Sequence, residues 1–329
     1  FIERRMLMAH QVETMAYAGE LPWHGLGQKV EDNLTPQEMI AAAGLDWSVS
    51  RRQVFVPQEP GHGHTEGTLT TQEYGMLVRD SDNYILGPCG KNYVPIQNEE
   101  VFSFFDKFVK EGDMTMGTAG SLNHGRQVWG LANIRQGFKL PGGDEVQGHL
   151  LISHPHQWGK SLTIMFTPIR VVCNNTLTMA LGQKGDRFRM PHVKAFDADV
   201  KQSAELALGL ASKQLESFEE QSKFLASKQY TDDKFDQFLA QLFQPALLPN
   251  VDRTQFNRTC ETVHELVYTQ PGHKMSEGSW WSAVNAVTYF ADHKAGRSRD
   301  ASLSSAWFGP RAATKRRALE LATEYAEAA

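Results

Sequence analysis

The sequence has few cysteines and no long hydrophobic run. Its 329 residues include only three cysteines, which stand far apart at Cys89, Cys173 and Cys260. An odd number of widely spaced cysteines excludes a dense disulfide framework and indicates a reducing compartment. A membrane-spanning helix needs roughly 18 consecutive apolar residues, and no run approaches that length. We therefore expect a cytoplasmic protein with no membrane partner.

Common catalytic motifs are missing as well. No glycine-rich segment is followed by the Lys-Ser/Thr of a P-loop, and neither CxxC nor HExxH occurs. The pairs His62/His64 and His154/His156 lie in Pro/Gly turns, whereas a zinc site needs three or four ligands. A two-metal nuclease needs clustered carboxylates, and no spacing indicates one. The sequence favours a binding protein without cofactor or metal over an enzyme.

Charge is distributed unevenly along the chain. The net charge is −5 overall, but it is −7 over residues 1–112, +5 over 113–194 and −3 over 195–329. A basic segment between acidic flanks is typical of a nucleic-acid-binding protein. A chance fluctuation on a solvated surface gives the same pattern, so charge alone does not decide the function.

Hydrophobic periodicity predicts an α+β fold with three regions. Residues 1–112 form an N-terminal α+β region, with a helix starting at Thr35-Pro36. Residues 113–194 form a basic core with four strands joined by short turns, which indicates an antiparallel β-meander followed by a helix. Residues 195–329 form a mostly helical C-terminal region. The four strands are expected at 114–122, 127–134, 146–153 and 161–172, and the last helices at 198–228, 232–243, 252–268, 280–293 and 312–328.

The last strand of the meander contains Arg170, a few residues before an expected helix start. Asn175 or Thr176 suits the N-cap of a helix over 177–181. Free N–H groups and the positive dipole end of a helix bind anions, phosphate above all. The alternative is an ordinary capped helix beside a solvated arginine.

Basic residues of the meander alternate in sequence with Trp129, Phe138 and Trp158. Bases stack on aromatic rings while Lys and Arg contact the phosphate backbone of the strand. Neither contact depends on the base sequence. Trp158, in a Gly-flanked turn next to Lys160, is the better stacking candidate, and Trp129 also suits a core position. The candidate nucleic-acid-binding residues are Arg126, Arg135, Lys139, Trp158, Lys160, Arg170, Asn175, Thr176, Arg187 and Arg189.

The C-terminal helices carry a second basic cluster and a polar stripe. The basic cluster surrounds a serine-rich loop and predicts a mobile loop followed by a solvated helix face; its members are Arg297, Arg299, Arg311, Lys315, Arg316 and Arg317. Asn285, Thr288 and Asp292 share one face of the preceding helix. That stripe predicts a buried polar contact with another element or subunit.

Three separated segments carry a family resemblance: Arg-Val-Val-Cys-Asn-Asn-Thr-Leu from Arg170, residues 8–27, and residues 280–293. Together they resemble the phage/plasmid-like proteins of a domain-of-unknown-function family found in phages, prophages and mobile plasmids. The resemblance implies a setting in mobile DNA of a bacterial host cell and no agreed chemistry.

We therefore expect a sequence-independent single-stranded DNA binding and annealing protein that acts in recombination or replication and assembles into a ring or filament. A basic meander ending in a helix is similar in outline to the annealing proteins related to the eukaryotic recombination mediators, and fold likeness is weak evidence for function. Two alternatives stay open. One is a metal-dependent nuclease or other phosphate-acting enzyme that uses His154, His156 and acidic residues from the N-terminal third. The other is an interaction protein that inhibits a host defence factor.

Overall fold

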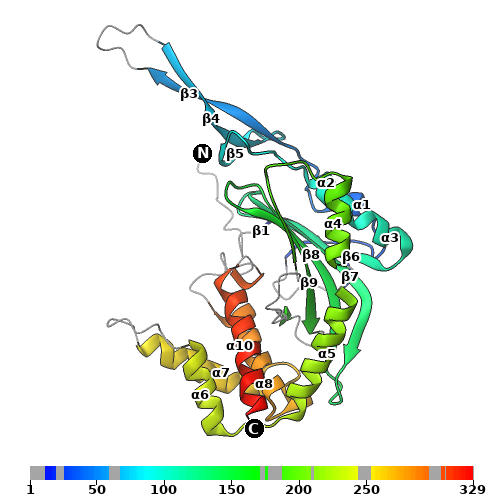
Figure 1. The fold of residues 1–329 in the computed structure, drawn as a ribbon, viewed down its shortest axis with the longest axis vertical. Coiled ribbons are helices and arrows are strands. Elements are labelled where there is room, and N and C mark those ends of the chain that lie inside the picture. Colours follow the sequence, from blue (N-terminus) through cyan, green and yellow to red (C-terminus); the bar gives the residue numbers. More distant parts are fainter. Residues whose placement is uncertain are drawn as a thin grey trace. The chain divides into compact units, whose positions relative to one another are not determined.

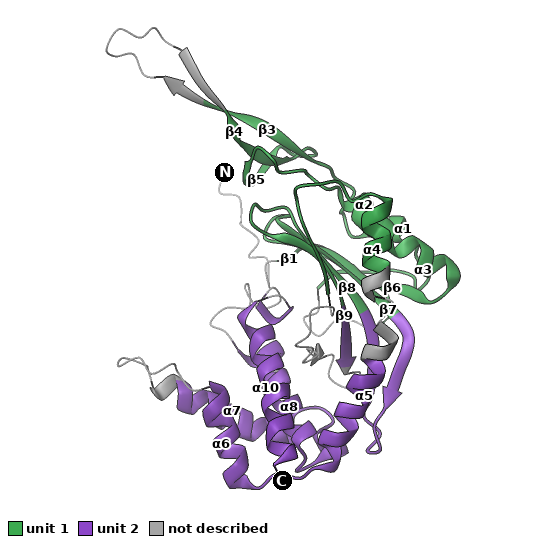
Figure 2. Cartoon of the chain, in the orientation of Figure 1, with its two compact units in different colours: residues 1–133, 150–165, 187–208 green, residues 134–149, 166–186, 209–329 purple. Residues whose placement is uncertain are grey.

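The computed structural model describes residues 12–19, 26–58, 67–170, 175–176, 187–208, 211–243, 253–295, 305–307 and 309–328. These residues fall into two compact units (Figure 2). Unit 1 comprises 1–133, 150–165 and 187–208, and unit 2 comprises 134–149, 166–186 and 209–329. The units cut across the three regions predicted from composition, because three strands pass from one unit into the other. The chain is α+β, as predicted, with antiparallel strands and a helical C-terminal region.

The larger sheet contains the predicted meander (Figure 1). Its eight strands follow the order β10-β9-β8-β7-β6-β1-β2, and β11 pairs with β9. Strands β6 to β9 are therefore neighbours in both sequence and space, which confirms the meander. The strands are β1 (Val12–Tyr17), β2 (Gln28–Lys29), β6 (Met114–Leu122), β7 (Gln127–Lys139), β8 (Glu145–Pro155), β9 (Ser161–Arg170), β10 (Asn175–Thr176) and β11 (Arg187–Pro191).

The smaller sheet belongs to unit 1 and has the order β3-β4-β5. Strands β3 (Val49–Gln58) and β4 (Gly67–Arg79) form a long antiparallel hairpin, and β5 (Tyr84–Gly90) pairs with the second half of β4. Its core consists of apolar side chains from all three strands and the following loop. They are Val49, Leu77, Leu86, Cys89 and Tyr93. Cys89 is a buried free thiol, as expected for a chain without a disulfide framework.

The helices of unit 1 are α1 (Pro36–Ala42), α2 (Asn98–Phe102), α3 (Asp106–Glu111) and α4 (Ala198–Leu208). The predicted start of α1 is confirmed by a capping box, in which the Glu38 amide donates to Thr35 Oγ1 at 3.2 Å. A 3-10 segment at Ser103–Phe105 separates α2 from α3. Gly112, in the left-handed region at φ 77°, ends α3.

Unit 2 is built around the helices α5 (Ala211–Ser227), α6 (Asp232–Phe243), α7 (Arg253–Thr269), α8 (Trp280–Tyr289) and α10 (Pro310–Glu327). Helix α8 is buried along its length and packs against α5, α7 and α10. Trp281 is fully buried, and its indole Nε1 donates to Asp144 Oδ2 at 2.8 Å. In the described part of the chain, no helix has the length and apolar character needed to cross a membrane.

The structure differs from the sequence prediction just after β9. Asn175 and Thr176 form the two-residue strand β10, whose partners are Arg170 and Ile169 of β9. These two residues pair antiparallel with the end of β9, and the sheet thereby satisfies their backbone groups. The helix predicted over 177–181 lies outside the described residues. The anion site expected there stays a prediction.

Candidate nucleic-acid interface

A hollow of about 480 Å³ opens on unit 1 between the β4–β5 ribbon, the β8–β9 turn and the end of β11. Two aromatic rings, Tyr74 and Trp158, stand at its edge with 53% and 55% of their surfaces exposed. Their ring centroids lie 6.1 Å apart at an interplanar angle of 67°, an edge-to-face contact. The hollow is lined by Glu73, Tyr74, Gly90, Lys91, Asn92, Tyr93, Trp158, Gly159, Lys160, Ser161, Pro191, His192 and Val193.

The tight turn between β8 and β9 displays Trp158. The Lys160 amide donates to the Gln157 carbonyl at 3.3 Å, and Gly159 takes φ 77°, which glycine adopts without strain. The indole packs over the backbone of Gly90, where an added Cβ would lie 3.4 Å from the ring. The ring is therefore held on one side by a strand and exposed on the other.

A bulge in β4 brings Tyr74 to the same hollow. The pairing of β3 with β4 shifts from Gln53↔Gly75 to Val54↔Thr71, so residues 72–74 have no opposite residue on β3. An Arg51 guanidinium nitrogen donates to the Gln72 carbonyl at 3.0 Å and holds the bulge. Bulges of this kind redirect side chains, often beside functional sites. Here the bulge directs Glu73 and Tyr74 into the wall of the hollow.

The floor of the hollow is made of buried rings. Tyr93 and His192 are stacked with centroids 4.9 Å apart at 5°, and the Val94 amide donates to the His192 carbonyl at 2.8 Å. His154 lies behind, 5.5 Å from His192 and 4.3 Å from His156 between ring centroids. These contacts join the segment after β5 to the end of β11.

The buried histidines are neutral at neutral pH. Desolvation lowers the pKa of His156 to about 3 and that of His192 to about 4, and it lowers the pKa of His154 well below its ordinary value. The floor therefore carries no charge. No three His, Cys, Asp or Glu side chains in the described ranges are grouped as metal ligands would be.

Positive charge at the hollow comes from two exposed lysines. Lys91 Nζ pairs with Glu73 Oε1 at 2.8 Å, and both side chains are more than half exposed. An exposed pair of this kind contributes at most about 1 kcal/mol to stability. Lys160 is also exposed and follows Trp158 in the turn. The wall of the hollow thus combines aromatic rings, two lysines and one carboxylate.

Two arginines extend the basic character along β11. Arg187, Arg189 and Pro191 point to one face of β11, opposite Met165, Thr163 and Ser161 of β9. Ser161 and Pro191 line the hollow, so Arg189 and then Arg187 follow on the same face in steps of about 7 Å. Both arginines are exposed. They form a row that starts at the hollow.

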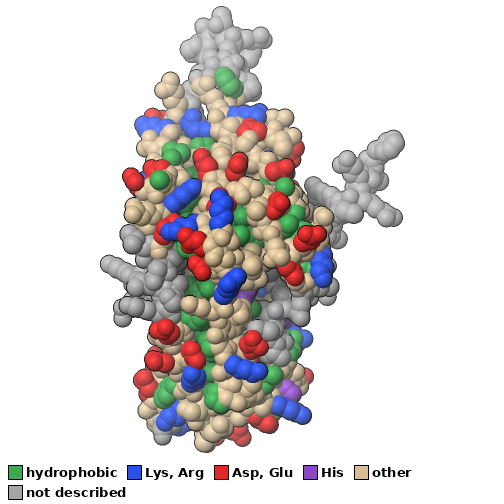
Figure 3. Space-filling model, turned by 90° about the vertical axis from the view of Figure 1, so that its right-hand side faces the viewer, with side chains coloured by type: hydrophobic (Ala, Val, Ile, Leu, Met, Phe, Trp, Pro, Cys, Tyr) green, Lys and Arg blue, Asp and Glu red, His purple; other side chains and the backbone are tan. Residues whose placement is uncertain are grey.

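Of the other predicted binding residues, those whose side chains are described do not line the hollow. Arg126 is half-buried in the β6–β7 turn, and Arg135 and Lys139 are exposed on the part of β7 that belongs to unit 2. The side chains of Arg170, Asn175 and Thr176 lie outside the described part. On the face drawn in Figure 3, Lys and Arg side chains lie among Asp and Glu side chains rather than in one continuous band.

Trp129 takes the core position that the sequence also allowed, and a stacking role for Phe138 is wrong. Trp129 is fully buried, and its ring packs so closely on Gly120 that an added Cβ there would overlap it. Phe138 is also buried and packs against Phe218 with ring centroids 6.0 Å apart. Both side chains belong to the core because their strand faces turn inward. Of the three aromatic candidates, only Trp158 is available for stacking.

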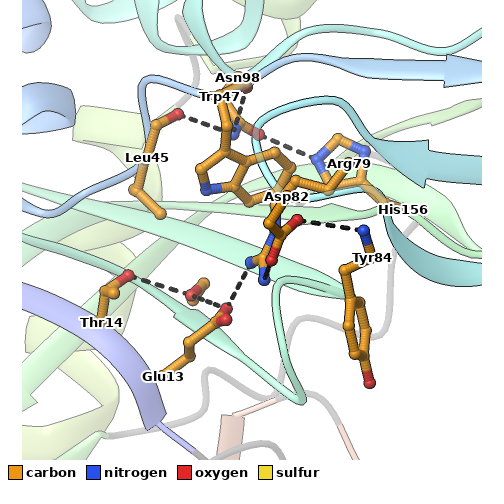
Figure 4. Close-up of polar contacts among 10 residues, drawn as sticks. Glu13, Thr14, Leu45, Trp47, Arg79, Asp82, Tyr84, Asn98 and His156 are labelled. Carbon is orange, nitrogen blue, oxygen red and sulfur yellow. Dashed lines mark hydrogen bonds and ion pairs between the residues drawn. The ribbon is translucent and has the colours of Figure 1, made fainter.

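A buried arginine supports the β4–β5 ribbon (Figure 4). Arg79 ends β4, and its Nη1 donates to Glu13 Oε2 at 2.9 Å while Nη2 donates to Asp82 Oδ2 at 2.8 Å. The guanidinium also lies 5.4 Å from the ring centroids of Trp47 and Tyr84. The hydrogen bond to Asp82, followed by the Glu13 contact, raises the pKa of Arg79 against the effect of burial. Arg79 therefore joins β1, β4 and the β4–β5 turn.

Sequence reasoning missed Glu73, Tyr74, Lys91 and Val193 as wall residues of the hollow. All but Val193 come from the acidic first 112 residues, and no motif marks them. The only local sequence signal of the bulge is the glycine after Tyr74. A side chain would not fit at Gly75, since an added Cβ there would lie 2.9 Å from both Arg51 Nε and the Arg52 carbonyl.

Comparison with known proteins identifies a family and no function. The profile of a family described as a domain of unknown function (DUF932) matches residues 85–317, more than two thirds of the chain. None of the curated proteins and none of the solved structures compared with the chain matches it. The matched range includes most of β5, the meander and most of the C-terminal helices. The chain therefore belongs to the family of proteins with the domain of unknown function DUF932.

Proposed function

We propose that the protein binds single-stranded DNA without sequence preference and promotes annealing, in the recombination or replication of a phage or mobile element in the bacterial cytoplasm. One observation carries the proposal. The half-exposed rings of Trp158 and Tyr74 meet at 6.1 Å over a hollow that also contains Lys160. Aromatic platforms beside lysines are the usual means of holding unpaired bases without reading their sequence.

Each group has a distinct role in this proposal. Trp158 stacks on a base, and Tyr74 supports its ring edge-to-face. Lys160 pairs with the adjacent phosphate, and Arg189 and Arg187 neutralise the next ones along β11. The uncharged floor of Tyr93 and His192 suits the apolar face of a base. A stacked duplex offers no free base face to the hollow, so single strands are preferred.

Self-association is part of the proposal. One hollow and two arginines contact only a few nucleotides, so a single chain binds weakly. A ring or filament of copies on one strand multiplies the affinity without new contacts. The phage, prophage and plasmid setting is also part of the proposal, and it comes from the sequence resemblance.

A second candidate is an interaction protein that inhibits a host defence factor. The observation that favours it is the apolar character of the rim, where Val193 is 59% exposed beside Pro191 and Trp158. Aromatic residues are enriched at protein interfaces. This candidate predicts no affinity for oligonucleotides and co-purification with a host protein.

Substitutions in the hollow test the proposal. Trp158→Ala should weaken the binding of a fluorescent oligothymidylate roughly 5- to 150-fold, since stacking on one aromatic ring contributes about 1–3 kcal/mol. Lys160→Ala should reduce the slope of log affinity against log salt by about 0.7, the value for one phosphate contact on a single strand. Fluorescence anisotropy at several salt concentrations measures both.

Matched controls lie outside the hollow. Tyr268 on α7 is 55% exposed, like Trp158, and Lys110 on α3 is an exposed lysine. Tyr268→Ala and Lys110→Ala should leave affinity and slope unchanged. Equal losses in the control and hollow variants would contradict the proposal. Mixing labelled complementary strands with the protein then shows whether binding accelerates annealing.

A further inference from the structure

The ion pair between Glu73 and Lys91 stands in the wall of the hollow. Lys91 Nζ lies 2.8 Å from Glu73 Oε1, with 54% and 61% of the two side chains exposed. We propose that Glu73 competes with the ligand: its carboxylate occupies Lys91 in the free protein, and a phosphate of the bound strand takes its place. This inference rests on the proposed function and concerns how the affinity of the same hollow is limited.

The two partners come from elements that the fold places separately. Glu73 belongs to the bulge of β4, at the register shift of the β3–β4 pairing, and Lys91 follows the end of β5. Because the pair is exposed, it is weak and exchanges readily. A phosphate oxygen offers an ammonium group the same charged acceptor as a carboxylate oxygen. Lys91 can therefore change partner at small cost.

The exchange limits affinity in two ways. The strand must displace a carboxylate from Lys91, so this lysine adds little net attraction. The displaced Glu73 also stays beside the hollow and repels the phosphate that replaced it. An annealing protein has to release each strand once it is paired. A built-in competitor keeps binding reversible while Trp158 preserves the stacking contact.

The test compares Glu73→Gln with the wild-type protein on oligothymidylate. Removing one exposed like charge should tighten binding about threefold. It should also make the slope of log affinity against log salt steeper by about 0.7, because the phosphate contact of Lys91 is then no longer offset by a displaced carboxylate. The double variant Glu73→Gln/Lys91→Ala should lose the added slope. Glu219, which pairs with Lys223 at 2.6 Å on α5, provides a matched control, and Glu219→Gln should change nothing.

Three outcomes would overturn the inference. If Glu73→Gln binds no tighter while Trp158→Ala still weakens binding, Glu73 is no competitor and the proposed function survives. If Glu73→Gln weakens binding to oligodeoxycytidine alone, Glu73 accepts a hydrogen bond from the cytosine amino group instead. If neither the wild-type protein nor Glu73→Gln binds oligonucleotides, the proposed function fails together with the inference.

Discussion

Asp292→Asn should lower the free energy of unfolding by about 3–5 kcal/mol, the usual cost of breaking a buried ion pair. Lys315 Nζ lies 2.7 Å from Asp292 Oδ1, with 1% and 4% of the side chains exposed. Burial lowers the pKa of Lys315, and the charge of Asp292 opposes that shift. The substitution leaves a buried ammonium group without its countercharge. Urea denaturation measures the loss, and hydrogen exchange should place it in α10 and in the π-helical segment Phe290–Lys294 that follows α8.

The controls separate burial from charge. Arg317 and Glu324 form an ion pair on the exposed side of α10, 3.0 Å apart, and Glu324→Gln should cost no more than about 0.5 kcal/mol. Asp292→Leu combined with Lys315→Met should recover most of the loss, since an apolar pair of similar volume replaces both charges. Similar effects of Asp292→Asn and Glu324→Gln would show that the pair is not buried in solution.

Arg79→Met should destabilise unit 1 by a similar amount, about 3–5 kcal/mol. The substitution removes hydrogen bonds to Glu13 and Asp82 and leaves Glu13, whose side chain is 18% exposed, without its cation. Arg79→Lys should retain only part of the stability that Arg79→Met loses, because an ammonium group cannot bond two carboxylates with the geometry of a guanidinium. Hydrogen exchange should show lost protection in β1, β4 and β5.

Arg52 provides the matched control on the same hairpin. It pairs with Asp80 at 3.0 Å, and the two side chains are 47% and 33% exposed. Arg52→Met should therefore cost less than about 1 kcal/mol. If Arg79→Met lost no more stability than Arg52→Met, the buried network would not hold the sheets of unit 1 together.

Much of the fold was predictable because its signals are local. Met114–Leu122 forms β6 with the predicted bounds, since turn residues end the alternating pattern on both sides. Thr35 and Pro36 start α1 as predicted, because capping involves only neighbouring residues. The reversal at Asn175 and Thr176 was not predicted, because their pairing with β9 depends on contacts across the sheet.

The candidate site was predictable only in part. Trp158 and Lys160 were found because a glycine-flanked turn exposes whatever it carries. Tyr74 and Glu73 were not, because the bulge that carries them lies at a register shift between β3 and β4, where Arg51 and Arg52 approach Gly75 closely, and no motif in the sequence marks that approach. Lys315 was expected on a solvated face and is buried, since its partner Asp292 lies on a different helix. The stripe of Asn285, Thr288 and Asp292 was expected to be buried, and it is.

The most direct test of the central claim is photocrosslinking of the wild-type protein to oligothymidylate, followed by mapping of the modified peptides. The account predicts adducts on the peptides that contain Trp158 and Tyr74, because these exposed rings meet the bases. An excess of unlabelled single strand should abolish the adducts, and an equal mass of duplex should not. Adducts confined to the helices of unit 2, or no adduct at all, would contradict the claim that this hollow binds single-stranded DNA.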